Sequence, residues 1–158
     1  MRRALLALLL MVAVPAWAAE PRDLSWQEMI PPDAPVEVPN MTPLHDLSNM
    51  ADALSAEAAP AARQDLPNAP VVAQLNGQHI RLPGYIVPLE VSEEGRTTEF
   101  LLVPYFGACI HTPPPPANQI IHVFPATPLK QELSKDSLFV SGVLETVRSE
   151  TGMGTAGY

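Results

Sequence analysis

Proline limits what this chain can fold into more strongly than any other residue type. The 158 residues include 19 prolines, more than double the share in an average protein. Proline ends a helix and cannot donate to the hydrogen-bond ladder of a central strand. Many of the prolines lie in residues 31–43 and 58–70, which we interpret as linkers. Long helices are therefore excluded from much of the chain.

The N-terminus has the pattern of a secretory signal. Arg2 and Arg3 precede an apolar run over residues 4–14, and small residues follow up to Ala18. This pattern predicts a signal peptide over residues 1–18, cleaved after Ala18. The apolar run is about half of the roughly 20 residues that cross a bilayer. We therefore expect a periplasmic protein with no membrane anchor after cleavage.

The charge of the chain excludes one large class of partners. The precursor has nine basic and 17 acidic residues and a net charge of −8, and two of the basic residues are Arg2 and Arg3. Cleavage would thus leave a net charge of about −10, which repels the phosphate backbone of nucleic acids. An acidic surface favours solubility and attracts cations, but it does not by itself indicate a metal site.

Residues 19–68 are interpreted as an arm rich in proline and alanine, with short helices. Residues 23–30 predict a turn of helix with Asp23 or Ser25 as its cap and Trp26 as a packing anchor. Further along, apolar residues recur at the three- to four-residue spacing of an amphipathic helix. These residues are Leu44, Leu47, Ala51 and Leu54.

Residues 69–158 predict a β domain. A short apolar run at 71–75, the turn signal Asn76-Gly77 and an alternating stretch from residue 78 together predict a hairpin. We expect its second strand to continue to Leu89, with Pro83 and Pro88 at bulges or on an edge. Further strands are expected at residues 97–103, 119–124 and 137–147. The predicted fold class is mainly β, a small antiparallel barrel or OB-like domain that follows the arm.

The lone cysteine is the most informative residue for function. Cys109 is the only cysteine in a chain that we expect to be exported, and thiols in that compartment are driven into disulfides. Cys109 must then be buried and inert, bound to a metal, reactive, or joined to another chain. Each of these four states predicts a different response of the thiol to labelling reagents.

A metal site is one of the functional hypotheses. Cys109 and His111 are two residues apart, so their side chains would share a face of an extended segment. Thiolate and imidazole are the ligands that zinc or copper prefers. His122, on the next predicted strand, is the best candidate for a third ligand. His45 and His79 are interpreted as ordinary surface histidines.

Two other functions stay open. In a thiol enzyme, Cys109 would be the nucleophile, His111 or His122 would lower its pKa, and Asn118 or Gln119 would orient the imidazole or hold an oxyanion. In a docking module, Cys109 would be structural, and the prolines at 113–116 with their aromatic neighbours would bind a partner.

Several segments resemble a family of exported bacterial proteins of unknown function. These segments are residues 82–89, 99–119 and 157–158, and the resemblance extends over about residues 26–31 and 71–158. Similar proteins continue past the terminal segment into another strand. The resemblance therefore predicts that this β domain lacks its last strand, which would leave an edge open at residues 137–147.

The resemblance also implies a functional context. Members of this family are encoded beside export-type ABC transporters with large periplasmic permease domains, in some bacteria within zinc-responsive gene clusters. This implies a periplasmic accessory to metal homeostasis or envelope transport, with an ABC transporter permease as its partner. The motif residues of the family map onto Cys109, His111, Asn118 and Gln119. We therefore expect Cys109 and His111 at the centre of a zinc site, with Asn118 and Gln119 as polar groups around it.

Overall fold

The structure is a computed structural model that describes residues 20–34, 63–109, 113–130 and 136–158. The expected signal peptide, the helix expected around residues 44–54 and His111 lie outside these residues. The described chain is mainly β, as predicted, with three short 3₁₀ turns. Its elements in chain order are β1 (Arg22–Asp23), η1 (Trp26–Met29), η2 (Ala73–Leu75), β2 (Gln78–Val91), β3 (Arg96–Val103), η3 (Ala117–Gln119), β4 (Ile121–Val123), β5 (Leu129–Lys130), β6 (Leu138–Leu144), β7 (Ser149–Thr151) and β8 (Gly154–Ala156).

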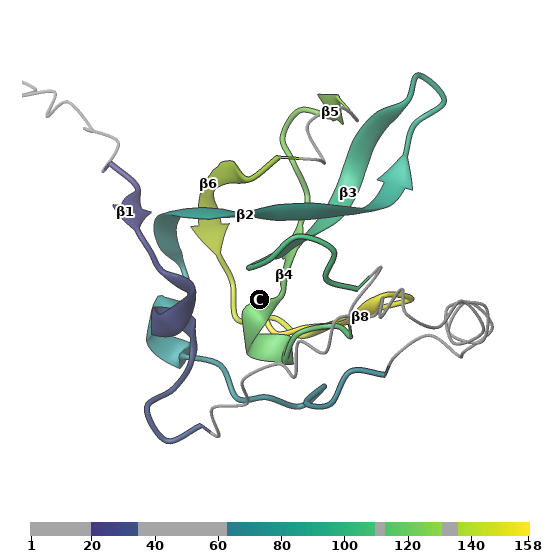
Figure 1. Ribbon diagram of the computed structural model, residues 1–158. Helices are drawn as coiled ribbons and strands as arrows, with labels where there is room; N and C mark the ends of the chain where they lie inside the picture. Colours follow the sequence, from purple (N-terminus) through teal and green to yellow (C-terminus); the bar gives the residue numbers. More distant parts are fainter. Residues whose placement is uncertain (1–19, 35–62, 110–112, 131–135) are drawn as a thin grey trace, which may run out of the picture.

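Strand β2 is the longest strand and organises the main sheet (Figure 1). Its first half pairs with β6, from Gln78 opposite Leu144 to Gly84 opposite Leu138. Its second half pairs with β3, beginning with Tyr85 opposite Val103. A single strand thus takes part in two antiparallel ladders and links them.

Gly84 lies at the point where β2 passes from one partner to the other. A Cβ atom at this position would lie 2.8 Å from Cγ of Leu102 and 2.9 Å from the carbonyl oxygen of Val103. Contacts this short do not occur between real side chains, so only glycine lets β2 and β3 approach this closely. Further along β2, the register shifts between Pro88 and Glu90, which agrees with the bulge predicted near Pro88.

The core lies on both faces of β3. Phe100 and Leu102 belong to one buried cluster, which also includes residues of β2 and β6, whereas Leu101 and Val103 belong to a second cluster on the opposite face. Successive strand residues point to opposite faces. A run of four consecutive buried residues therefore requires cover on both sides, and β3 has it.

The main sheet is not closed into a barrel. It has six strands in the order β1-β2-β3-β4, with β5 on β3 and β6 on β2, and β7 and β8 form a separate two-stranded sheet. Within the described part of the chain, β6 is paired along one edge only, by β2. The mainly β prediction is therefore confirmed, but the closed barrel is not formed.

The hairpin predicted before β2 is wrong. Residues 71–75 do not form a strand: Ala73–Leu75 is the 3₁₀ turn η2, and β2 pairs with the distant β6 instead. The backbone N–H of Val72 donates to the hydroxyl of Tyr158, so it is not available for a ladder. The turn itself was predicted correctly, because Gly77 has a positive φ of 77°.

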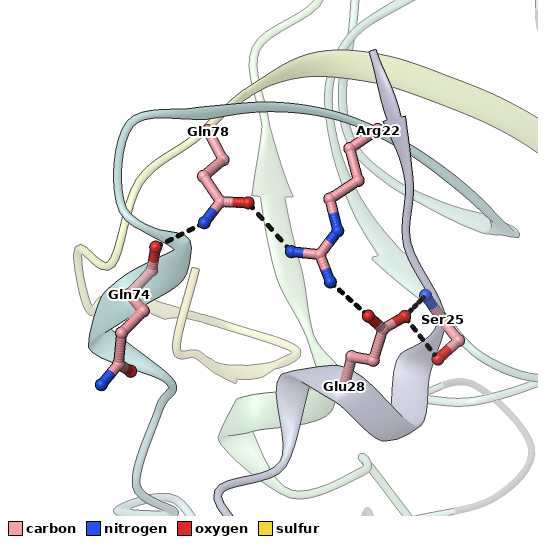
Figure 2. A network of polar contacts seen from close by, with 5 residues as sticks. All are labelled: Arg22, Ser25, Glu28, Gln74 and Gln78. Atoms are coloured by element: carbon pink, nitrogen blue, oxygen red, sulfur yellow. Dashed lines mark hydrogen bonds and ion pairs between the residues drawn. The ribbon is translucent and has the colours of Figure 1, made fainter.

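Polar side chains hold the N-terminal segment against β2 (Figure 2). The carboxylate of Glu28 accepts hydrogen bonds from the N–H and the hydroxyl of Ser25, both at 2.9 Å, which confirms Ser25 as the cap of η1. Arg22 forms an ion pair with Glu28 and donates to Oε1 of Gln78 at 3.1 Å. The indole of Trp26 donates to the carbonyl of Pro83 at 2.7 Å, so Trp26 is the packing anchor that was predicted.

The last residues of the chain are locked into the core beside η3 (Figure 1). The hydroxyl of Tyr158 donates to the carbonyl of Met29 at 2.8 Å and accepts from the N–H of Val72 at 2.8 Å. Gly157 donates to the carbonyl of Ala117 at 2.7 Å.

No helix within the described ranges has the length and apolar character to span a membrane.

Candidate functional site

Cys109 lies in the turn that follows β3, half-buried against the second core cluster. Its φ is +65°, and it is the one residue other than glycine with a positive φ among those the structure describes. This left-handed conformation costs a non-glycine residue on the order of 1 kcal/mol or more, so the surrounding structure must impose it. Burial raises the pKa of the Cys109 thiol to about 11.

The two ends of the segment around Cys109 are joined by a hydrogen bond. The hydroxyl of Tyr105 donates to the carbonyl of Pro113 at 3.3 Å. The proline run is fixed from the other side as well, because the amide of Gln64 donates to the carbonyl of Pro115 at 2.7 Å. Tyr105, which precedes Cys109, and Pro113, which follows it, are thus held together.

Asn118 and Gln119 connect η3 to the N-terminal segments. The amide of Asn118, which is buried, donates to the carbonyl of Pro70 at 2.9 Å. The amide of Gln119 donates to the carbonyl of Trp26 at 2.9 Å. The structure therefore assigns both amides a role in binding backbone, and their predicted role around a metal stays a prediction.

His122 lies on β4, and both of its ring nitrogens have partners. Nε2 lies 2.6 Å from Oε1 of Glu99, and Nδ1 lies 2.6 Å from Oγ of Ser149. Within the described ranges, no three His, Cys, Asp or Glu side chains gather in a way that could hold a metal ion. To bind zinc, His122 would have to give up one of these two partners.

Sequence reasoning missed Glu99 and Ser149. They are 23 and 27 residues away from His122 in the sequence, on β3 and β7. Strand β3 was predicted, and Glu99 on it is an acidic residue directly before the apolar run Phe100–Val103, which could have drawn attention to it. Nothing in the pattern around Ser149 signals a short strand.

A cavity of about 840 Å³ opens beside His122 and Ser149, which both line it. Residues of β4 and β6 line it, together with Ile80, Phe100 and Leu102. It therefore occupies the gap at which the sheet fails to close. Apolar cavities with a few polar groups at one end are the usual form of a small-molecule site.

Comparisons with known proteins agree with this fold. A family model described as "Protein of unknown function (DUF3299)" matches residues 26–158. The crystal structure of a DUF3299 family protein from Pseudomonas aeruginosa PAO1 is similar, with a TM-score of 0.73 and 51% sequence identity over 87% of this chain and 89% of that chain. A search of curated proteins finds no match. The comparisons thus identify a family and a fold, and the activity has to be argued from the residues.

Proposed function

The chain belongs to the DUF3299 family of proteins of unknown function, and we propose that it is a periplasmic accessory protein that binds zinc through Cys109 and His111. The observation that supports this proposal most is the placement of Cys109. A lone thiol is held in a strained turn, at the start of a segment whose two ends are joined by the bond from Tyr105 to Pro113. The surrounding structure thus orders Cys109 before any ligand binds, which lowers the cost of binding at the thiol.

The donor set fits zinc in part. Cys109 supplies sulfur and His111 supplies nitrogen, but zinc takes four ligands in most protein sites. The remaining positions would be filled by water, by a residue of a partner protein, or by His122 after release of Glu99 or Ser149. An incomplete shell suits a protein that passes a metal on or senses it, which agrees with an accessory role beside an envelope ABC transporter.

The environment of Cys109 favours binding over thiol catalysis. A catalytic cysteine needs a lowered pKa, because the thiolate is the nucleophile, whereas burial raises the pKa of Cys109 to about 11. A metal ion displaces the thiol proton directly, so a raised pKa weakens zinc binding but does not abolish it. Zinc binding at Cys109 should accordingly release a proton and become tighter as the pH rises.

Zinc titration of four proteins tests the proposal. Wild type should bind one zinc ion, and its thermal midpoint should rise with zinc. Cys109→Ser and His111→Ala should each lose most of the affinity. His79→Ala, which removes a histidine of β2 far along the chain from this segment, should bind as wild type does. Equal, weak binding by all four would disprove the zinc site.

Labelling of Cys109 separates zinc binding from the other two functions. If zinc binds, an alkylating reagent should react more slowly when zinc is present. A thiol enzyme predicts fast labelling of the folded protein at neutral pH, and a docking module with a structural cysteine predicts labelling only after unfolding, with or without zinc. For the docking module, capture of a purified transporter permease that is unaffected by Cys109→Ser would be the supporting result.

A further inference from the structure

Glu99, His122 and Ser149 form a chain of hydrogen bonds across three strands. The carboxylate of Glu99 lies 2.6 Å from Nε2 of His122, and Oγ of Ser149 lies 2.6 Å from Nδ1. The His122 side chain is 11% exposed and that of Glu99 is 24% exposed. The zinc proposal rests on Cys109 and His111, and it involves this chain of hydrogen bonds only if His122 also binds the metal.

The proton positions in this chain follow from the donors and acceptors available. An ionised carboxylate only accepts hydrogen bonds, so Nε2 of a neutral His122 must carry the ring proton and donate it to Glu99. Nδ1 then has a free lone pair and accepts from the Ser149 hydroxyl. A carboxylate thus fixes the imidazole in the tautomer that can take a proton from serine.

Ser149 and His122 line the apolar cavity between β4 and β6. Several apolar side chains of this cavity are exposed, which is unusual for residues that only stabilise a fold. They are Phe124 at 70%, Phe139 at 60%, Val143 at 65% and Val147 at 61%. A volume of about 840 Å³ accommodates a medium-length hydrocarbon chain whose polar end reaches Ser149.

Strand β6 borders the same cavity. Every residue from Leu138 to Glu145 lines the cavity. Side chains of a strand alternate between its two faces, so the edge of β6 itself must border the cavity. In the described residues this edge has no strand partner, so its N–H groups are available to a charged oxygen that develops in the cavity.

We propose that Ser149, His122 and Glu99 form the catalytic centre of an esterase that cleaves carboxylic esters with an apolar acyl chain. Oγ of Ser149 would bond to the ester carbonyl carbon while its proton moves to Nδ1 of His122. The tetrahedral intermediate then breaks its bond to the alcohol oxygen, which takes the proton from His122 and leaves. Water, deprotonated by His122, next attacks the acyl-serine, and a carboxylic acid and free Ser149 result.

Two assays on the purified protein test the catalytic centre. A fluorophosphonate probe should label Ser149, as located by peptide mass spectrometry, and p-nitrophenyl octanoate should be hydrolysed. Ser149→Ala and His122→Gln should each lower hydrolysis by about 100-fold or more, and Glu99→Gln should lower it less. Ser137→Ala, which removes the hydroxyl of an exposed serine outside the cavity lining, should keep both labelling and hydrolysis.

Folding and metal controls keep the result interpretable. Each variant should retain the wild-type circular dichroism spectrum, and hydrolysis should persist in a chelator, because no step uses a metal. A folded wild type that hydrolyses no octanoate ester and leaves Ser149 unlabelled would overturn the proposal, as would Ser149→Ala with wild-type activity. The hydrogen-bond chain would then only hold β3, β4 and β7 together.

The length of the acyl chain tests the role of the cavity. Gly142 of β6 lines the cavity on the same face of the strand as Val140 and Leu144, and a Cβ atom there meets nothing within 4 Å, so Gly142→Phe should fill space without disturbing the core. We expect this variant to hydrolyse the octanoate ester at least about tenfold more slowly while it keeps wild-type rates on the acetate ester. Equal loss on both esters, or no loss on either, would show that the acyl chain does not lie in this cavity.

Discussion

Cys109 combines features that an inert core residue does not need. It has a left-handed backbone, and the chain offers it no second cysteine. An alanine or valine in a regular turn would fill the same space at lower conformational cost. The strain at Cys109 therefore supports a role in binding.

The pKa of Cys109 predicts how stability depends on pH. Burial raises this pKa from about 9 to about 11 in the folded protein. The folded state thus holds the thiol proton where the unfolded state releases it, so this contribution to stability is complete below about pH 9 and is lost as the pH rises towards 11. The thermal midpoint of wild type relative to Cys109→Ser should fall between pH 8 and pH 10.5. A constant difference over this range would contradict the raised pKa.

The elements of the sheet depend on close contacts that single substitutions can test. Gly84→Ala would place a Cβ within 3 Å of Leu102 and of the Val103 carbonyl. Backbone cannot move aside as easily as a flexible side chain, so we expect a loss of about 1–3 kcal/mol in the free energy of unfolding, measured with urea. Gly142→Ala, on β6, meets nothing within 4 Å and should change stability by less than about 1 kcal/mol. Similar effects of both substitutions would show that β2 and β3 are less closely packed than described.

Local sequence patterns predicted individual elements but did not predict which elements pair with each other. The alternation that begins at Gln78 predicted β2, and Ser25 with Glu28 predicted the start of η1. Residues 71–75 have the apolar character of a strand, but their backbone is used by Tyr158, 86 residues away. Strands β7 and β8 were missed because their residues show no apolar alternation.

Of the two candidate sites, the one at Cys109 could be predicted from the sequence and the one at His122 could not. Cys109 could be selected from the sequence because a lone cysteine is unusual in an exported chain, whatever the fold. The partners of His122 could not be selected from the sequence, because Glu99 and Ser149 contact His122 only when β3, β4 and β7 come together. The topology of the sheet brings these three residues together, and no short sequence motif predicts that topology.

The molecule as a whole is tied together at its C-terminal residue. Tyr158 joins η1 through Met29, the segment before η2 through Val72, and β4 through the N–H of His122, which donates to the Tyr158 carbonyl at 2.8 Å. These contacts therefore join residues from both ends of the described chain. The family match over residues 26–158 includes all of these contacts.

Tyr158→Phe tests this role without changing the shape of the side chain. It removes the hydroxyl that bonds both Met29 and Val72 in a buried position. Leaving buried backbone groups unpaired costs about 1–3 kcal/mol, so the urea midpoint should fall accordingly. Tyr85→Phe, which removes the hydroxyl of a half-buried ring packed on Phe106, should have a smaller effect. If the two variants were equally stable, the C-terminal residue would not hold the fold together.

The proposed zinc site is tested most directly by zinc X-ray absorption of the zinc-loaded protein. One sulfur at about 2.3 Å and nitrogen or oxygen donors at about 2.0–2.1 Å are expected, and the sulfur should be absent from Cys109→Ser. A wild-type spectrum with nitrogen and oxygen donors alone would contradict the central claim that Cys109 binds the metal.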